Sequence, residues 1–538
     1  MRTYAMIAVG LSVGSAAIAL VGDKARALAT VAPPAPFEIS GTVTDASGAP
    51  VRGAFVTVAD EQSAISRLTD SNGAYRIVVP YPAEFSLSAS RFGFATQSVT
   101  LTSKDNGTRS FQLSPEFDRT QLTSAQITSF LPKNTETDWL KARCVGCHGM
   151  TEPEQFRGSD EGVFDSILRN MQLSYGITFL HDPDLKYAAK LTTKYFGKDA
   201  PAPSLETVKS RPVDQEALKA TIFTINLRNT DRRGLPHSIV ADRKGGAWIA
   251  VPGNNEITHW DFESGKLSSV AMPKPVSMPH TPTLDRTGRV WTGMPGARQM
   301  SVITPGTNDV RYVDLESVPH TLSTDADGII WGNGSKVYRV DPATDKVTYW
   351  QPIDVTPGPR SWVARGATPG QPGPQTGPAY AYHAVRDAAG IVWYSVLETG
   401  GIVRLDPATG QQKYIQLPGV ASVRGIDVDN DGVIWATDWT DGHLVRYDPV
   451  SGQSSLFSIP TEGAMPYSVF VDRKRGYIWT ADYAGNNLVR LDPESGKFVE
   501  YPLPNNESYP RFISIDDDGR IWFAEWWNNR AGLLDPGY

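Results

Sequence analysis

The sequence contains only two cysteines, Cys144 and Cys147, among its 538 residues. Two thiols exclude a fold that several disulfides stabilise. The sequence also has no excess of basic residues, since 51 Lys and Arg stand against 58 Asp and Glu and give a net charge of −7. Nucleic-acid-binding proteins usually present a strongly basic face, so we expect no nucleic-acid partner. Long low-complexity tracts are absent, which argues against wholesale disorder.

Apolar residues form one long run, at the N-terminus. Residues 5–22 follow the basic Arg2, and the small residues that come next allow cleavage after Ala27 or Ala29. This pattern is typical of a secretory signal peptide over residues 1–29, and an uncleaved membrane anchor is the alternative. No later stretch is apolar enough to span a bilayer. We therefore expect a periplasmic protein with no membrane span in its mature form.

Turn-forming residues are abundant, with 48 Gly and 40 Pro, and favour a mainly β fold of several domains. Residues 37–113 alternate apolar and polar positions between turn signals about every ten residues, which predicts a small N-terminal β-sandwich. The phrases ISGTVTDASGAPVRGAFVTV and TDSNGAYRIVVP in this segment resemble the carboxypeptidase regulatory-like domain, a transthyretin-like sandwich. The resemblance implies a structural or adhesive module without catalytic residues.

Residues 120–200 change to the spacing of helices, with apolar residues at steps of three and four. Thr137 and Asp138 form one plausible helix start, and Asp182 begins another. We expect a small helical domain here. Its predicted helices cover 122–131, 139–148, 163–171 and 185–196.

Residues 213–538 contain an internal repeat of about 40 residues. Each copy has an Asp, a turn with Gly and then a Trp. The recurring tryptophans are Trp248, Trp291, Trp331, Trp393, Trp435, Trp479 and Trp522. Seven repeats with four strands each predict a seven-bladed β-propeller, with a Pro- and Gly-rich insertion at 353–379. The strand 221–227 precedes the first repeat, and we expect it to complete the seventh blade.

The propeller phrases GIVRLDPATG, HLVRYDPVSG, NLVRLDPESG and IWFAE resemble the streptogramin B (virginiamycin B) lyase family. The resemblance covers the C-terminal region of the chain. It implies a propeller and, as its activity, a magnesium-assisted C–O elimination that opens an ester linkage.

The two cysteines form the motif Cys144-Val145-Gly146-Cys147-His148. This C-x-x-C-H spacing predicts one covalent haem c, with both thiols bound to haem and His148 as a ligand of the iron. A redox disulfide and half of a zinc site are the alternatives. The phrase WLKARCVGCHG resembles small cytochrome c domains, which often carry a Met in a following helix. The resemblance implies Met171 as the sixth ligand of the haem iron, and His181 is its main rival.

Polar side chains recur in the propeller at a position that should lie beside the central channel. Five residues before the Asp of each repeat stand His237, His280, His320, Tyr382, Arg424, Tyr467 and Arg511. His383 is one place off this register, and a β-bulge would bring it in. Three residues after the Trp of the last three blades stand Asp438, Asp482 and Glu525. Because the first two strands of a blade run antiparallel, we expect these acids and the histidines at one mouth of the propeller.

Three functions are compatible with this organisation. The first is a haem-linked oxidoreductase that acts on a small-molecule substrate at the mouth, with His237, His280, His320 and Glu525 as catalytic residues, and passes electrons to a periplasmic partner. The second is a lyase that uses a divalent metal ion held by Asp438, Asp482 and Glu525. The third is a non-enzymatic electron-transfer or binding module, in which the polar mouth binds only water.

Overall fold

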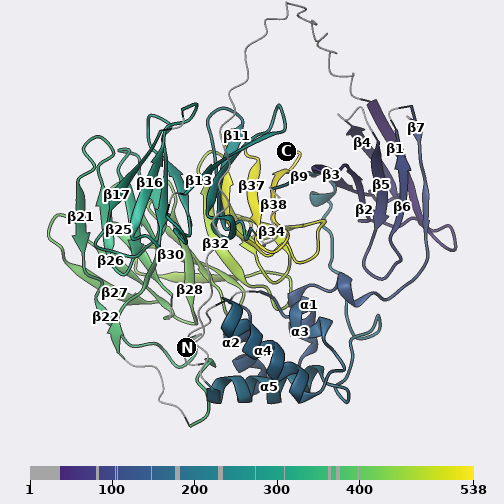
Figure 1. Cartoon of the computed structure of the whole chain (residues 1–538), viewed down its shortest axis with the longest axis horizontal. Helices are drawn as coiled ribbons and strands as arrows, with labels where there is room; N and C mark the ends of the chain where they lie inside the picture. Colours follow the sequence, from purple (N-terminus) through teal and green to yellow (C-terminus); the bar gives the residue numbers. More distant parts are fainter. Residues whose placement is uncertain are drawn as a thin grey trace, which may run out of the picture.

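Strands dominate the structure, a computed structural model of the chain (Figure 1). It describes residues 37–538 except 80–83, 103, 106, 147, 176–181, 228–233, 273, 308, 362–364, 371–375 and 398. The predicted signal peptide, Cys147 and His181 therefore lie outside the described residues. Among the described helices, none is long and apolar enough to cross a membrane.

The first strands form the expected β-sandwich-like unit, which lies at the right of Figure 1. One sheet pairs β4, β1 and β7, with β8 also on β1, and the other pairs β3, β2, β5 and β6. The strand bounds are β1(Phe37–Asp45), β2(Phe55–Ala59), β3(Ser63–Leu68), β4(Ala74–Val79), β5(Phe85–Ser90), β6(Gln97–Leu101), β7(Gly107–Thr108) and β8(Phe111–Leu113). Every second side chain of β5 is buried, as expected for a strand with one face on a core. Ile39, Val56 and Leu87 belong to that core.

Helices fill the next segment and lie below the propeller in Figure 1. They are α1(Ser124–Phe130), α2(Thr135–Cys144), α3(Thr151–Gln155), α4(Glu161–Tyr175) and α5(Asp182–Phe196). The prediction for the second helix was wrong by several residues. The Asn134 side chain accepts the N–H groups of Glu136 and Thr137, so α2 begins earlier than expected. It also ends at Cys144, which places His148 beyond the helix.

The remaining strands form four-stranded antiparallel sheets in sequence order. Six of the blades consist of β10(Ser238–Ala241), β11(Gly246–Val251), β12(Glu256–Asp261), β13(Lys266–Ala271); β14(Pro282–Leu284), β15(Val290–Met294), β16(Gln299–Ile303), β17(Val310–Asp314); β18(Pro319–Thr324), β19(Ile330–Gly334), β20(Val337–Val340), β21(Val347–Trp350); β24(Ala381–Arg386), β25(Val392–Val396), β26(Gly401–Leu405), β27(Gln412–Gln416); β28(Val423–Val428), β29(Ile434–Asp438), β30(His443–Tyr447), β31(Ser454–Ser458); and β32(Pro466–Asp472), β33(Tyr477–Asp482), β34(Asn487–Asp492), β35(Lys497–Pro502). The insertion adds a two-stranded ribbon, β22(Asp354–Val355) and β23(Gly377–Pro378).

The seventh blade takes its fourth strand from before the first repeat. It consists of β36(Pro510–Ile515), β37(Ile521–Glu525), β38(Arg530–Asp535) and β9(Thr221–Asn226). Ile225 on β9 lies opposite Ala531 on β38, which confirms that this strand completes the blade. The innermost strand of each blade contacts those of its two neighbours, and β36 contacts β10, so the ring of seven blades is closed. The predicted seven-bladed propeller is therefore present.

One sheet joins the sandwich to the propeller. The outer edge of β9 pairs with β3 of the sandwich, where Phe223 lies opposite Ile65. An eight-stranded sheet results, in the order β36-β37-β38-β9-β3-β2-β5-β6. This pairing covers the exposed edge that a propeller blade would otherwise present to solvent.

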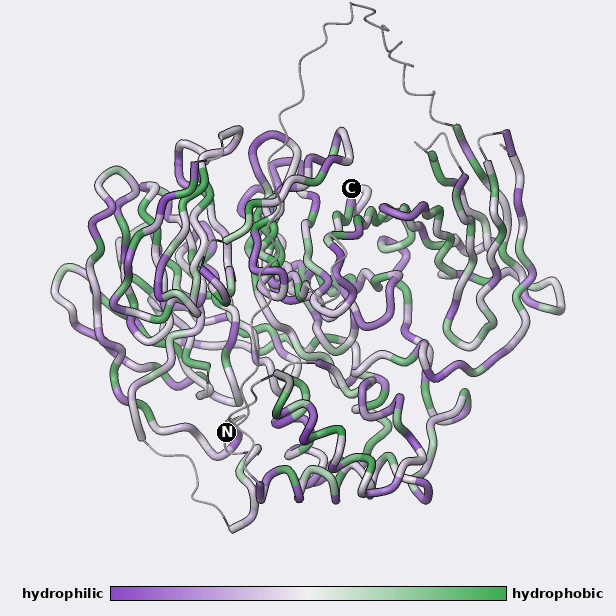
Figure 2. Tube along the Cα trace, in the orientation of Figure 1, coloured by the Kyte–Doolittle hydropathy of each residue, from purple (hydrophilic) through white to green (hydrophobic). Residues whose placement is uncertain are grey.

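The recurring Asp and Trp have the structural role that their turn position indicates. In five blades the Trp indole Nε1–H donates to the Asp carboxylate, as Trp435 does to Asp429 at 2.9 Å. The other oxygen of Asp429 accepts backbone N–H groups of the turn. Figure 2 shows hydrophobic and hydrophilic stretches alternating along the blades, with apolar strands beside polar turns.

Candidate functional site

The predicted channel residues meet at the propeller axis. The ring centroids of His237 and His280 are 3.7 Å apart, and those of His280 and His320 are 4.3 Å apart. His320 lies 4.3 Å from Tyr382, whose hydroxyl donates to Tyr467 Oη at 2.5 Å. Tyr467 Oη lies 3.5 Å from His237 Nε2, which closes the circle. We call these five side chains the axial ring.

Two arginines add positive charge to the axial ring. The Arg424 guanidinium lies over Tyr467 at 4.8 Å, and the Arg511 guanidinium lies over the same ring at 5.2 Å. Such cation–π contacts favour the charged guanidinium at a buried aromatic face. Burial and the neighbouring Tyr467 raise the pKa of Tyr382 well above its ordinary value, so its phenol is protonated at neutral pH.

The three histidines of the axial ring are neutral at physiological pH. Burial, the imidazole of His280 and the guanidinium of Arg511 lower the pKa of His237 well below its ordinary value. Burial and Arg511 lower the pKa of His280 to about 3. His237 is buried, whereas His280 and His320 are half-buried. The side of the ring formed by the second and third blades is therefore the more accessible side.

We expect the propeller to lose stability as the pH falls from about 7 towards 4. The unfolded state binds a proton on each His near pH 6.5, but the folded axial ring does so only at lower pH. The contribution of these histidines to the free energy of unfolding is therefore fully present above about pH 6.5. Below that pH it decreases, by at most about 1.4 kcal/mol per pH unit for each fully buried His. Thermal unfolding followed by circular dichroism measures this trend. His280→Gln should flatten the pH dependence, and His443→Gln, outside the ring, is the control; equal slopes in all three proteins would contradict the assignment.

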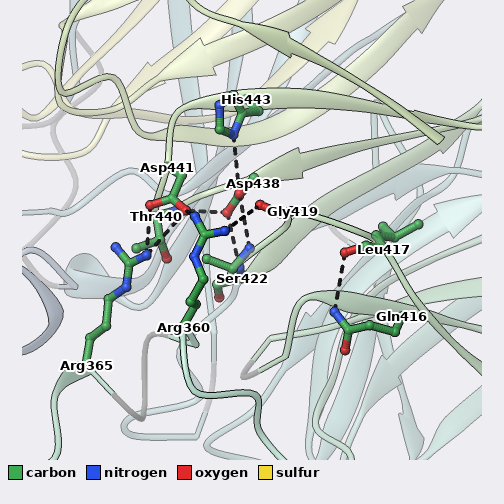
Figure 3. Close-up of polar contacts among 11 residues, drawn as sticks. Arg360, Arg365, Gln416, Leu417, Gly419, Ser422, Asp438, Thr440, Asp441 and His443 are labelled. Atoms are coloured by element: carbon green, nitrogen blue, oxygen red, sulfur yellow. Dashed lines mark hydrogen bonds and ion pairs between the residues drawn. The ribbon is translucent and has the colours of Figure 1, made fainter.

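The three acids do not form the expected metal site. Asp438 accepts the backbone N–H groups of Ala421 and Ser422, both at 3.1 Å, and lies 3.4 Å from His443 Nδ1 (Figure 3). Within the described part of the chain, no group of three or more His, Cys, Asp and Glu could hold a metal ion. The acids at the second-strand ends therefore do not assemble a second metal centre.

Asp482 and Glu525 have the same kind of role in their own blades. Asp482 accepts the N–H of Met465 at 2.8 Å, and Glu525 accepts the side-chain amide of Asn505 at 2.9 Å. Burial raises the pKa of both carboxyl groups above their ordinary values. The physical reason for the correction is that each acid satisfies polar groups in the segment before its own innermost strand, rather than converging on the axis.

The described residues of the C-x-x-C-H segment contact propeller side chains that neighbour the axial ring. Arg511 Nη2 donates to the carbonyl of Gly146 at 3.0 Å, and the His148 ring lies 5.7 Å from Trp527. A Cβ on Gly149 would lie 2.3 Å from Tyr509 Oη, so only glycine permits this close approach. The sequence predicted both features, but it did not predict that they meet.

The described residues of this segment are suitable for binding a haem through His148. His148 Nδ1 lies 3.0 Å from the carbonyl oxygen of Gly149. Because a carbonyl only accepts, Nδ1 carries the hydrogen and Nε2 carries the lone pair that a metal needs. Met171 lies on α4 with a half-buried side chain. Its role as sixth ligand remains a prediction.

A continuous apolar core holds the helices on the propeller. It joins the helix residues Trp139 and Leu140 to Trp439, Tyr483 and Trp526, among other propeller residues. These three aromatic residues each directly follow Asp438, Asp482 or Glu525 in the sequence. A recurring aromatic residue after the second-strand acid is thus the sequence signal that could have indicated the docking face.

The insertion adds polar contacts between the propeller and the helices. Arg365 Nη2 lies 3.0 Å from Asp441 Oδ1, and Arg360 also pairs with Asp441 (Figure 3). Further along the insertion, the hydroxyl of Thr368 accepts the Trp139 indole N–H at 3.3 Å. The insertion therefore ties the fifth blade to α2, a contact that its sequence did not indicate.

Comparison with known proteins gives two family matches. The virginiamycin B lyase family matches residues 372–537, and the carboxypeptidase regulatory-like domain matches residues 38–114. The last four blades are virginiamycin B lyase-like. Neither match includes the helical segment. Among curated proteins, none matches the chain.

Several solved structures are similar. A streptogramin B lyase structure has 20% identity and a TM-score of 0.48, covering 58% of this chain and 97% of that chain. A virginiamycin B lyase from Staphylococcus aureus has 22% identity and a TM-score of 0.49, covering 59% and 99%. The hydrazine synthase of Kuenenia stuttgartiensis has 12% identity and a TM-score of 0.44, covering 57% and 96%.

Proposed function

We propose that this chain is a periplasmic c-type cytochrome fused to a propeller and that it works as an oxidoreductase on a small molecule at the axial ring. Cys144 and Cys147 would attach the haem, and His148 would ligate its iron. Haem c supplies a one-electron carrier when it is bound. The observation that supports the proposal is the contact of the C-x-x-C-H segment with the propeller axis, through Arg511 and Gly146.

The axial ring has the groups that bind a polar substrate beside this segment. His320 Nδ1 lies 3.1 Å from the carbonyl oxygen of Tyr382, which uses its hydrogen, so Nε2 of His320 offers a lone pair on the more accessible side of the ring, where the neutral imidazole of His280 also lies. The two imidazoles can therefore orient hydroxyl or amine groups by hydrogen bonds.

The axial ring also contains a path for a proton. Tyr382 donates to Tyr467, so the hydrogen of Tyr467 is free to point to His237 Nε2, 3.5 Å away. Nδ1 of His237 lies 2.7 Å from the hydroxyl of Ser238. A proton released as a substrate is oxidised can pass along this chain of hydroxyl and imidazole groups, from Tyr467 through His237 to Ser238.

Two adjacent tryptophans lie between the axial ring and His148. The His237 ring lies 5.5 Å from Trp526, and Trp527 lies 5.7 Å from His148. Trp526 and Trp527 are adjacent in the chain, so one short segment of the seventh blade contacts both the axial ring and His148. Electrons would then leave the haem to a periplasmic electron-transfer partner.

A lyase is the second candidate, because the virginiamycin B lyase family matches residues 372–537. It would use the same mouth for an elimination that leaves the haem unchanged. The two candidates differ in what the histidines do: hold an oxidisable molecule next to the haem ligand, or assist the removal of a proton from an ester substrate.

Rapid-mixing measurements of haem reduction test the proposal. The wild-type protein is screened against small periplasmic alcohols, phenols and amines, and we expect at least one of them to reduce its haem. His280→Ala and His320→Ala should slow that reduction by about 100-fold or more, since each removes a group that orders the substrate. In the matched control His443→Gln, the substrate should reduce the haem at the wild-type rate.

Two results would count against the oxidoreductase. One is that no substrate reduces the haem in a manner that depends on His280 and His320. The other is turnover of an ester substrate that needs a divalent cation, persists in Cys144→Ala/Cys147→Ala protein and leaves the haem redox state unchanged, which would establish the lyase.

A further inference from the structure

The propeller axis opens into a second space at the end away from the helices. A cavity of about 710 Å³ lies between the innermost strands, where they approach the Asp-containing turns. The axial ring stands at the opposite ends of the same strands. Asp327, Ala388 and Asn430 line the cavity and are exposed, so they form its rim. The volume lies within the range of small-molecule sites.

Buried side chains with hydrogen-bonding groups line the cavity, and His383 is one of them. His383 is 5% exposed and lines the cavity beside Phe512, with 5.7 Å between the two rings. A bulge in β24 shifts the register between Ala381 and Ala384, as the sequence suggested, but it turns His383 to the cavity rather than to the axial ring.

The protonation of His383 suits it to a ligand that accepts a hydrogen bond. The Ile426 N–H donates to His383 Nδ1 at 3.4 Å, so the ring hydrogen is on Nε2. Burial lowers the pKa of His383 to about 4, and the ring is therefore neutral at pH 7. Among the residues that the structure describes, Nε2 has no hydrogen-bond partner. His383 lines the cavity, so a ligand or solvent in the cavity can accept this hydrogen.

The wall of the cavity has an excess of negative charge. Five aspartates and two arginines line it: Asp325, Asp327, Asp387, Asp427, Asp429, Arg386 and Arg473. Arg386 pairs with Asp325 and Asp327, and Arg473 pairs with Asp427. Asp387 and Asp429 accept only neutral donors within the described part of the chain, namely turn amides and a Trp indole. The field of this wall favours a cation and disfavours an anion.

We propose that this cavity is a second small-molecule site, which takes an organic amine bearing a hydroxyl group. The hydroxyl oxygen accepts the His383 Nε2 hydrogen, the apolar body of the ligand packs on Phe512, and the ammonium group lies towards the aspartate rim. Phe512 also lies 5.6 Å from His237, so one side chain contacts both His383 and the axial ring. The site needs neither a haem nor the activity proposed above.

Calorimetric titration of the full-length protein tests the site with three probes of one size. Tyramine is the cation, tyrosol is its neutral counterpart and 4-hydroxyphenylacetate is the anion. We expect tyramine to bind with a dissociation constant of about 1 mM or tighter, tyrosol to bind more weakly and the anion to bind at least tenfold more weakly. The preference for tyramine should decrease at high salt.

Two variants locate the binding. Ala388→Lys adds a positive charge at the exposed rim and should weaken tyramine binding about three- to tenfold, while tyrosol is affected little. Ala408→Lys makes the same change at an exposed turn of the same blade that does not line the cavity, and should leave both affinities unchanged. His383→Leu should weaken tyramine and tyrosol alike.

Three outcomes would overturn the proposal. In the first, tyramine does not bind. In the second, 4-hydroxyphenylacetate binds as tightly as tyramine. In the third, Ala388→Lys and Ala408→Lys change the affinity for tyramine equally. The rim variant keeps the test valid if His383→Leu does not fold, because residue 388 is exposed.

Discussion

Protein made with Cys144→Ala and Cys147→Ala, in a host that attaches haem c, is expected to retain no haem after denaturation, whereas the wild type retains one. The two thiols are the only cysteines of the sequence, so no other side chain can form the thioether bonds. The pyridine haemochrome spectrum of acid-precipitated protein, together with intact-protein mass, measures the effect. The expected change is complete loss.

The matched control for this experiment is Lys133→Ala. The Lys133 side chain is 79% exposed in the same helical segment, and its loss should leave haem attachment unchanged. A wild-type protein without covalent haem would show that the cytochrome interpretation is wrong. Thiol titration and zinc analysis would then decide between a redox disulfide and part of a zinc site.

Met171→His is expected to lower the reduction potential by on the order of 0.1 V or more, within the ~0.8 V range that axial ligands span. A thioether ligand stabilises reduced iron, and imidazole does so less. The ferric wild-type protein should also show the weak sulfur-to-iron absorption near ~700 nm, which the variant should lose. Spectroelectrochemical titration records both quantities in one experiment.

Leu173→Ala is the control for Met171. Leu173 is 81% exposed and lies two residues further along α4, so it points away from the Met171 face of the helix. If Met171→Ala leaves both the absorption and the potential unchanged, Met171 is not the ligand. His181 would then be the next residue to replace.

The axial ring and the acids illustrate how far sequence reasoning extends in a repeat protein. Aligning the repeats placed His237, His280 and His320 side by side, because equivalent positions in a closed ring must meet at its axis. The same alignment placed Asp438 and Glu525 near the mouth but gave no direction for their side chains. The structure turns Asp438 to backbone amides and Glu525 to Asn505, which local hydrogen-bonding needs decide.

The sequence by itself determined the features that depend on local periodicity. The Asp–turn–Trp spacing predicted the blades and the lone strand 221–227 predicted their closure, and the structure confirms both; the haem expected from Cys144 to His148 stays a prediction. Each of these follows from a pattern repeated along the chain or contained in a few adjacent residues.

Only the tertiary structure decided how these parts meet. The hydrogen bond from Arg511 to Gly146 joins residues 365 positions apart, and the pairing of β3 with β9 joins the sandwich to the seventh blade. Such contacts depend on the complementary shape of two folded surfaces and on the desolvation of their polar groups, and no local pattern encodes either. For the same reason, the cavity next to His383 became visible only once the blades had been placed around their axis.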